Sequence, residues 1–254
     1  MITLKVTSDV AATADRTEYI SGKYSKNEST AYLQTKELSI RYLASRDLNL
    51  WLAKLNGKNA LDYGSGLGFS VDYLLKHDFK VHAADINPEM IQQAKNVYPS
   101  AEFTLVSEQS LPYPNKSFDL VFSSYVLFEM NSLEKIITYL QHATRVLKDD
   151  GYIIAIIASQ NLYDPEYKSQ LYNTGFRENY MRQSGSLVKM SYNEINMTFT
   201  DYFWTETDYR TAFANAGLKI CAVHYPLGNK DENYPWQDEL TKSPLLLILA
   251  VKNN

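Results

Sequence analysis

A short apolar segment that runs into a glycine-rich loop and then into a helix constrains the fold of this chain most strongly. Residues Asn59–Asp62 have the pattern of a buried strand, and Gly64, Gly66 and Gly68 follow directly. Residues 69–76 then place apolar side chains at helical spacing. Side chains at the glycine positions would block a ligand from the backbone, so the pattern predicts a βα unit with a ligand at its loop.

The same alternation of strand and helix continues through most of the chain. Six further segments have strand patterns: 80–84, 101–106, 119–124, 152–158, 218–224 and 245–251. Helical patterns begin at Pro88, span 133–147 and span 205–216. Because no helix separates the last two strands, we predict an α/β fold with a Rossmann-like, doubly wound, seven-stranded sheet that is mostly parallel and has one antiparallel strand.

Two regions fall outside this alternation. Before the first strand the periodicity predicts N-terminal helices, one over 29–43 and one that begins after Ser45 as N-cap. Between 159 and 204 we expect an insertion that contains an antiparallel strand pair, 188–192 and 195–199, as a lid or a dimer flap. The predicted organisation is an N-terminal helical cap over 1–44 and a single domain over 45–254.

Three side chains around the loop narrow the kind of ligand. Phe69 stands where a dinucleotide-binding loop needs its third glycine, which disfavours a pyrophosphate. Asp62 would repel phosphate but attract an ammonium or sulfonium group. Asp85 ends the next strand, nineteen residues after Gly66, where a carboxylate can accept both hydroxyl groups of a ribose. Alternatively, Asp85 caps the helix that begins at Pro88.

Four stretches together resemble the class I S-adenosylmethionine-dependent methyltransferase superfamily, in its small-molecule branch (type 11/25 domain). They are Ala60–Gly68, Ala84–Met90, Leu111–Asp119 and Arg145–Gly151, and the resemblance covers residues 45–155 and 205–252. It implies S-adenosylmethionine as cofactor.

The resemblance also implies roles for individual residues. The glycine loop (Gly64, Ser65, Gly66 and Gly68) would pack under the methionine part of the cofactor, and Asp62 would bind its ammonium group. Asp85 would hold the ribose. Ile86 would stack on the adenine with Met90 nearby, and Ser107, Glu108 and Gln109 would meet the adenine edge. Many relatives have Asp at the position of Ser107, so the partner of the adenine amino group is open. Ser123, Ser124 and Tyr125 would border the methionine and the substrate.

Relatives often close the site with N-terminal side chains. Tyr24 is the candidate for a lid tyrosine, and Arg41 is the candidate partner for a carboxylate. The alternatives are a surface tyrosine and a solvated arginine on a helix.

Methyl transfer from a sulfonium is an in-line displacement, so alignment of the reactants supplies much of the catalysis. The acceptor wall should come from 125–130, 159–204 and 224–243. His224, the only histidine in these regions, is the candidate base, and Tyr125 is the candidate substrate-facing residue. Glu129 stands where many relatives have histidine and could act as base or bind a cationic acceptor. Either residue could instead have a purely structural role: His224 as a histidine at a strand end, and Glu129 as a carboxylate at the start of a helix.

Aromatic residues of these regions could enclose an aromatic or amphipathic molecule, or form a dimer contact. They are Tyr192, Phe199, Tyr202, Phe203, Trp204, Tyr234 and Trp236.

The composition of the chain limits which partners it can bind and in which cellular compartment we expect it. The net charge is −4 and no run of Lys and Arg exceeds two residues, which argues against nucleic acid. The single cysteine, Cys221, and an N-terminus without a signal-peptide pattern predict a cytoplasmic protein. The longest apolar run, 244–251, is too short for a membrane span. We expect no metal site, and a homodimer is possible.

The sequence thus predicts S-adenosylmethionine-dependent methyl transfer to a small molecule. A non-catalytic cofactor-binding protein or regulatory partner is the alternative, because no base is evident. A nicotinamide-dependent oxidoreductase is disfavoured by Phe69 and Asp62.

Overall fold

A seven-stranded mixed sheet forms the centre of the molecule in the computed structural model, which describes residues 17–20 and 38–253. Its strands are β2 (Asn59–Tyr63), β3 (Lys80–Asp85), β4 (Glu102–Leu105), β5 (Phe118–Ser124), β6 (Leu147–Ala158), β10 (Leu218–His224) and β11 (Leu245–Lys252). The spatial order is β10-β11-β6-β5-β2-β3-β4. Only β11 pairs antiparallel, with both β6 and β10, which confirms the predicted fold class.

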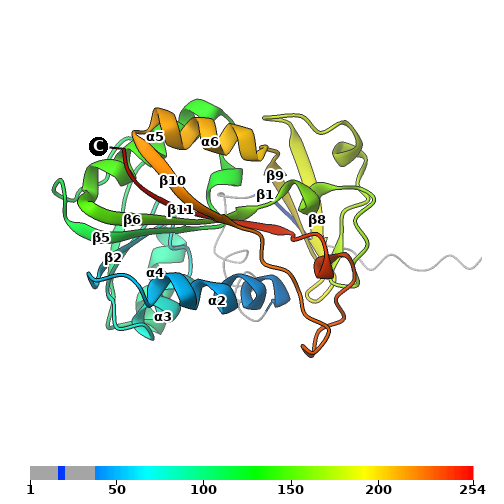
Figure 1. The fold of residues 1–254 in the computed structure, drawn as a ribbon, viewed down its shortest axis with the longest axis horizontal. Coiled ribbons are helices and arrows are strands. Elements are labelled where there is room, and N and C mark those ends of the chain that lie inside the picture. Colours follow the sequence, from blue (N-terminus) through cyan, green and yellow to red (C-terminus); the bar gives the residue numbers. More distant parts are fainter. Residues whose placement is uncertain (1–16, 21–37, 254) are drawn as a thin grey trace, which may run out of the picture.

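Helices cover both faces of this sheet (Figure 1). One face carries α2 (Ser39–Leu52), α3 (Phe69–Leu75) and α4 (Pro88–Val97), and the other carries α5 (Leu133–Val146) and α6 (Glu206–Asn215). The central strands β2, β5 and β6 are buried almost throughout, as parallel strands between two helical layers must be. The carboxyl ends of β2, β3 and β5 therefore meet at one edge of the sheet.

A second, four-stranded sheet stands beside that edge (Figure 1). It has the order β1-β9-β8-β7, with β1 (Thr17–Ile20), β7 (Tyr172–Asn173), β8 (Leu187–Tyr192) and β9 (Met197–Tyr202). The predicted antiparallel pair is present as β8 and β9. A projecting flap would leave the outer edges of this strand pair unpaired. Here both edges are paired, because β7 pairs with β8 and β1 pairs with β9.

The short one-turn helices are η2 (Leu127–Glu129), η3 (Gln160–Tyr163), η4 (Arg177–Met181) and η5 (Asp238–Leu240). At α6 the predicted N-cap is confirmed: Thr205 and Asp208 form a reciprocal capping box.

The prediction of a helix break at Ser45 is wrong. Helix α2 runs without interruption from Ser39 to Leu52, and the Ser45 hydroxyl donates to the Tyr42 carbonyl within the helix, at 3.2 Å. A serine in a helix interior can satisfy its hydroxyl in this way, so the residue type alone did not mark an end. The proposed boundary at 44/45 falls inside this helix, and residues 29–37 of the first predicted helix lie outside the described residues.

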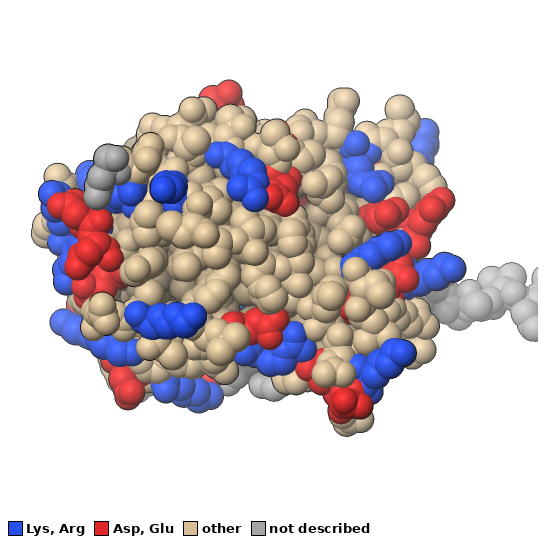
Figure 2. All heavy atoms as spheres, in the orientation of Figure 1, with Lys and Arg blue, Asp and Glu red and all other residues tan. Residues whose placement is uncertain are grey.

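Charges of both signs are interspersed on the face shown in Figure 2, around an uncharged centre over β10 and β11. This face has no continuous basic stripe of the kind that binds a phosphate backbone. Among residues 17–20 and 38–253, no helix combines the length and apolar character that crossing a bilayer requires. The same residues hold no group of three or more His, Cys, Asp or Glu placed to bind a metal ion.

Candidate active site

A cavity of about 900 Å³ opens where β2, β3 and β5 end. Residues that the sequence predicted for the cofactor make up much of its lining: Arg41, Gly64, Ser65, Gly66, Asp85, Ile86, Met90, Glu108, Gln109 and Ser124. Asp62, Gly68, Ser107 and Ser123 are absent from the lining, and Tyr24 lies outside the described residues.

The glycine loop presents bare backbone to this cavity. The amides of Gly64 and Ser65 both donate to the Ala84 carbonyl of β3, at 2.7 and 3.1 Å, which fixes the loop across the ends of two strands. Gly66 has φ +50°, and a Cβ atom placed on it would meet no atom within 4 Å. Open space at a lining glycine is what close approach of a ligand to the backbone requires.

Asp85, the last residue of β3, is hydrogen-bonded to the glycine loop. Its carboxylate accepts from the amide of Gly66 at 2.7 Å and from that of Asn87 at 2.8 Å. Helix α4 is capped instead by the Asn87 side chain, which accepts from the amides of Glu89 and Met90. The alternative reading of Asp85 as helix cap is therefore wrong. Burial raises the pKa of Asp85, against the opposing effect of these amide donors.

Asp62 is fully buried near the end of β2, just before the loop, and among the described residues neither carboxylate oxygen has a hydrogen-bond partner. Burial, and then the nearby charge of Asp85, raise its pKa to about 8. The hydroxyl of Ser65 is also buried and has no hydrogen-bond partner in the part of the chain that the structure describes. Orphaned polar atoms of this kind are rare in folded proteins, and they fit a site completed by a ligand with an ammonium group.

The side of the cavity where the sequence predicts the adenine combines an exposed apolar side chain with polar groups. Ile86 is 48% exposed although it is aliphatic, and Met90 is buried behind it. Glu108 pairs with Lys135 of α5 at 3.2 Å. Ser107 forms a backbone bridge with Ser110 and does not face the cavity.

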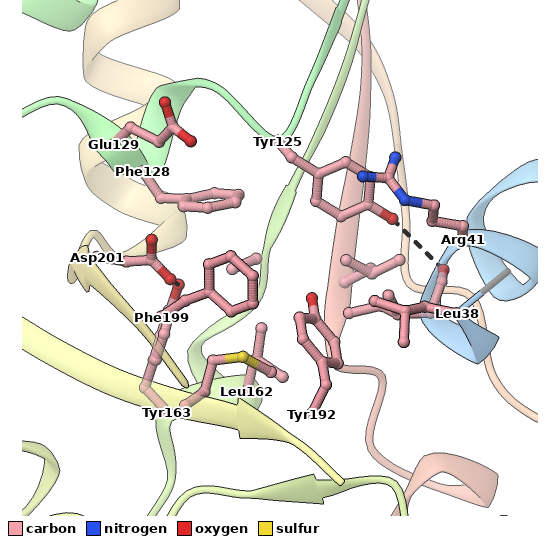
Figure 3. A pocket seen from close by; sticks show the side chains of 14 residues that line it. Leu38, Arg41, Tyr125, Phe128, Glu129, Leu162, Tyr163, Tyr192, Phe199 and Asp201 are labelled. Carbon is pink, nitrogen blue, oxygen red and sulfur yellow. Dashed lines mark hydrogen bonds between the residues drawn. The ribbon is translucent and has the colours of Figure 1, made fainter. Parts of the chain in front are cut away.

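A small recess of about 40 Å³ adjoins the large cavity (Figure 3). The two spaces share Arg41, Tyr125 and Glu129 in their lining. The rest of the recess is lined by Leu38, Ile40, Phe128, Ala158, Leu162, Tyr163, Met190, Tyr192, Phe199, Asp201 and Leu245. Both sheets therefore contribute to its wall.

Tyr125 and Arg41 form one side of the recess. Tyr125 has φ +61°, a left-handed conformation that is unusual for a bulky residue and marks a position under tertiary constraint. The Arg41 guanidinium lies 4.9 Å from the centre of the Tyr125 ring and 4.7 Å from that of Phe69. Arg41 is therefore a cavity residue and not a solvated helix arginine.

Glu129 lies on the opposite side, on η2 (Figure 3). Among the described residues its carboxyl group has no hydrogen bond or ion pair. Burial raises the pKa of Glu129 well above its ordinary value, and the charges of Asp201 and Asp85 add to the effect. Glu129 lies in the first turn of η2, as the reading of a helix-start carboxylate expects, and it also lines both spaces.

His224 lines neither space, so the expectation that it serves as base is not supported by its position. Its Nε2 lies 2.6 Å from an Asp47 oxygen on α2. Arg46 binds Asp47 as well and pairs with Glu232 at 2.5 Å. His224 thus belongs to a cluster that ties the end of β10 to α2.

The predicted aromatic residues divide between the cavities and the core. Tyr192 and Phe199 line the recess, and Tyr202 lines the large cavity. Phe203 and Trp204 are buried outside both, and Tyr234 packs between Tyr42 and Trp236, with 4.8 Å between ring centres in each pair.

Sequence reasoning missed Asp201 and Tyr163, which face the recess as a hydrogen-bonded pair. Asp201 is 3% exposed and accepts from the Tyr163 hydroxyl at 2.9 Å. The period of two that runs through Met197 and Phe199 also places residue 201 on that face. A charged residue at an apolar position of a strand was the available signal.

Comparisons with known proteins agree with this geometry. Residues 61–155 match the family model described as a methyltransferase domain. The Rickettsia bellii ubiquinone/menaquinone biosynthesis C-methyltransferase UbiE is 27% identical over 179 residues, which cover 63% of this chain and 68% of that protein. The human mitochondrial arginine-hydroxylase NDUFAF5 is 32% identical over 117 residues, 45% of this chain and 33% of that protein.

Among solved structures, an S-adenosylmethionine-dependent methyltransferase from Clostridium acetobutylicum superposes with a TM-score of 0.60 at 16% identity. The superposition covers 88% of this chain and 96% of that one. The glycine loop, the orphaned Asp62 and the family match converge on one conclusion: residues 61–155 form a class I S-adenosylmethionine-dependent methyltransferase domain.

Proposed function

We propose that this enzyme transfers a methyl group from S-adenosylmethionine to a small-molecule acceptor whose reacting end enters the recess. The observation that carries the proposal is the shared lining of the two spaces at Arg41, Tyr125 and Glu129. A recess of about 40 Å³ admits one functional group and not a polymer segment. The name of the UbiE relative, which places it in quinone biosynthesis, supports a small acceptor.

The residues around the large cavity would hold the cofactor by complementary chemistry. Asp85 offers carboxylate oxygens to the ribose hydroxyl groups, and Ile86 offers an exposed apolar surface to the adenine. Asp62 would balance the ammonium group, and the Arg41 guanidinium would bind the cofactor carboxylate. When bound, S-adenosylmethionine supplies an electrophilic methyl group on a sulfonium.

The chain itself aligns the acceptor and excludes water. Tyr125 lines both spaces and Phe128 lines the recess beside it, with 6.3 Å between their ring centres. Confinement of the acceptor between these rings favours in-line attack, because orientation is the main requirement of this displacement.

Calorimetry tests the cofactor site. S-Adenosylmethionine should bind the native protein, and Asp85→Asn should weaken binding about tenfold or more, since a ribose partner loses its charge. The matched control is Asp231→Asn, which removes an exposed carboxylate outside both spaces. No binding by the native protein, or equal affinities for the three proteins, would contradict the cofactor site.

Radiolabel transfer tests the acceptor class. The enzyme is incubated with methyl-labelled S-adenosylmethionine and with the protein, nucleic acid and ultrafiltered small-molecule fractions of a cell extract. Label should appear in the small-molecule fraction. Label in the protein fraction alone would contradict the proposal, as would cofactor binding without transfer to any fraction.

A second candidate function follows from one comparison. The arginine-hydroxylase relative shares a similar segment although its name states a different reaction. The transfer assay separates the two, because hydroxylation leaves the label on the cofactor.

A further inference from the structure

The ionisable groups of the recess are unevenly distributed. At the end away from Arg41, Glu129 and Asp201 both line the recess, and the ring of Phe128 lies between their carboxyl groups in the view of Figure 3. Tyr163 donates its hydroxyl to Asp201, whereas nothing among the described residues donates to Glu129. This end therefore presents two carboxyl groups whose oxygens can accept hydrogen bonds, and Glu129 is the group left to bind a ligand.

Aromatic rings surround these carboxyl groups. Phe128 and Phe199 lie on the side of the recess next to the two carboxyl groups, and Tyr192 lies farther away, below Tyr125 in the view of Figure 3. The faces of such rings attract cations, and a desolvated site strengthens the attraction. Acidic groups within an aromatic wall favour a cationic ligand and disfavour a carboxylate, which would lie against Glu129 as a like charge.

We infer that the acceptor carries a basic amine, whose nitrogen enters the recess and is bound by Glu129. This inference rests on the proposed methyl transfer and names the acceptor class of that same site.

The reaction balances with Glu129 as the proton acceptor. The Glu129 carboxylate takes one proton from the bound ammonium group, which leaves a neutral amine with a free electron pair. The nitrogen then forms a bond to the methyl carbon while the carbon–sulfur bond breaks, and the electron pair of that bond stays on sulfur. The products are a methylated ammonium ion and S-adenosylhomocysteine.

Binding of an amine has a proton signature that differs from that of other ligands. Burial raises the pKa of Glu129 well above its ordinary value, so the empty recess favours the protonated form of its carboxyl group. Formation of the amine pair then releases about one proton to the solvent, whichever partner gives it up. A neutral alcohol requires no such release.

The experiment is calorimetry on the full chain saturated with S-adenosylhomocysteine, in two buffers of different ionisation enthalpy. The probes are butylamine, benzylamine and phenethylamine, compared with the matching carboxylates and alcohols. We expect one or more amines to bind with proton release and the matching carboxylates to bind at least tenfold more weakly. Preference for carboxylates or alcohols, or binding of no amine, overturns the inference.

Variants show whether Glu129 is the group involved. Glu129→Gln should weaken amine binding roughly tenfold to a hundredfold and abolish proton release, and this loss should exceed any change in S-adenosylhomocysteine affinity. Glu129→Asp should retain part of the proton release. Glu166→Gln makes the same charge change at an exposed residue outside both spaces and should behave as the native protein. Unchanged amine binding in Glu129→Gln overturns the role of Glu129.

The result also separates this inference from the proposed function. If the native protein binds cofactor and methylates only alcohols or carboxylates of the panel, the amine inference fails and methyl transfer stands. If it binds no S-adenosylmethionine, the proposed function fails first.

Discussion

Asp62 is a fully buried carboxyl group whose pKa, about 8, lies above its ordinary value of 3.8. A raised pKa means that the folded state binds the proton more tightly than the unfolded state. The stability associated with this group is therefore complete below pH 3.8 and is lost as the pH rises toward about 8. At about 1.4 kcal/mol for each pK unit, the loss amounts to a few kcal/mol at neutral pH.

Asp62→Asn should consequently raise the free energy of unfolding of the cofactor-free protein at pH 8 by on the order of 1–3 kcal/mol, and by less at pH 5. Urea denaturation at the two pH values measures the difference. The same variant should bind S-adenosylmethionine more weakly, because the cofactor ammonium loses its counter-charge. Equal pH dependence of native and variant stability would show that Asp62 already has a partner.

His224 gives a second prediction at the scale of a residue. Because its imidazole is bound to Asp47 and faces neither space, His224→Gln should leave the rate of methyl transfer within about twofold of native. Labelled transfer to the small-molecule fraction measures it. A drop of a hundredfold or more, of the size that loss of a general base causes, would restore His224 as the catalytic base.

Helix α2 shows how one element is completed by another. Its N-cap residue, Leu38, has no side chain that can accept a hydrogen bond, and its first turn has no acidic residue. Glu194, in the turn between β8 and β9, accepts from the Ser39 amide at 3.2 Å and from its hydroxyl at 2.8 Å. The second sheet thereby supplies the negative charge that the helix N-terminus favours.

Glu194→Ala should lower the free energy of unfolding by about 1 kcal/mol, because the helix loses both its cap and a favourable charge. Urea denaturation measures the change, and Glu166→Ala, at an exposed site, is the control. An equal effect of the two substitutions would mean that the contact contributes no stability.

At the scale of the whole molecule, the recess depends on the junction of two sheets. Strand β9 supplies Phe199 and Asp201, and β1 pairs with it in parallel from Thr17↔Met197 to Ile20↔Thr200. The large cavity is lined mainly by the segments that follow β2, β3, β4 and β5 and by one face of α5, and it takes only Tyr202 from the described part of the second sheet.

Deletion of residues 1–20 should therefore affect the two spaces differently. Amide protection in β9 should fall in hydrogen-exchange measurements, because its edge loses hydrogen bonds, while β6 stays protected. S-Adenosylhomocysteine affinity should change little, whereas methyl transfer should decrease strongly. Unchanged protection of β9 would contradict the role given to β1.

The sequence by itself determined the seven-stranded sheet and the location of the cofactor cavity. Strand and helix periodicity, the glycine loop and the acidic strand ends are local patterns, and parallel strands bring their carboxyl ends to one edge wherever such patterns alternate. Asp85 and the loop from Gly64 to Gly66 could therefore be placed before any coordinates were known.

Only the tertiary structure decided which groups form the recess. Glu129 and Asp201 are 72 residues apart, and β9 reaches the main sheet through its packing beside η2. His224 is a residue that the sequence favoured and the tertiary structure did not. A histidine has the right chemistry for a base, but His224 lies against Asp47 of α2 and lines neither space. Contacts between segments distant in sequence depend on how the layers pack. The periodicity of a segment indicates which of its faces is buried, but it does not indicate which other segment packs against that face.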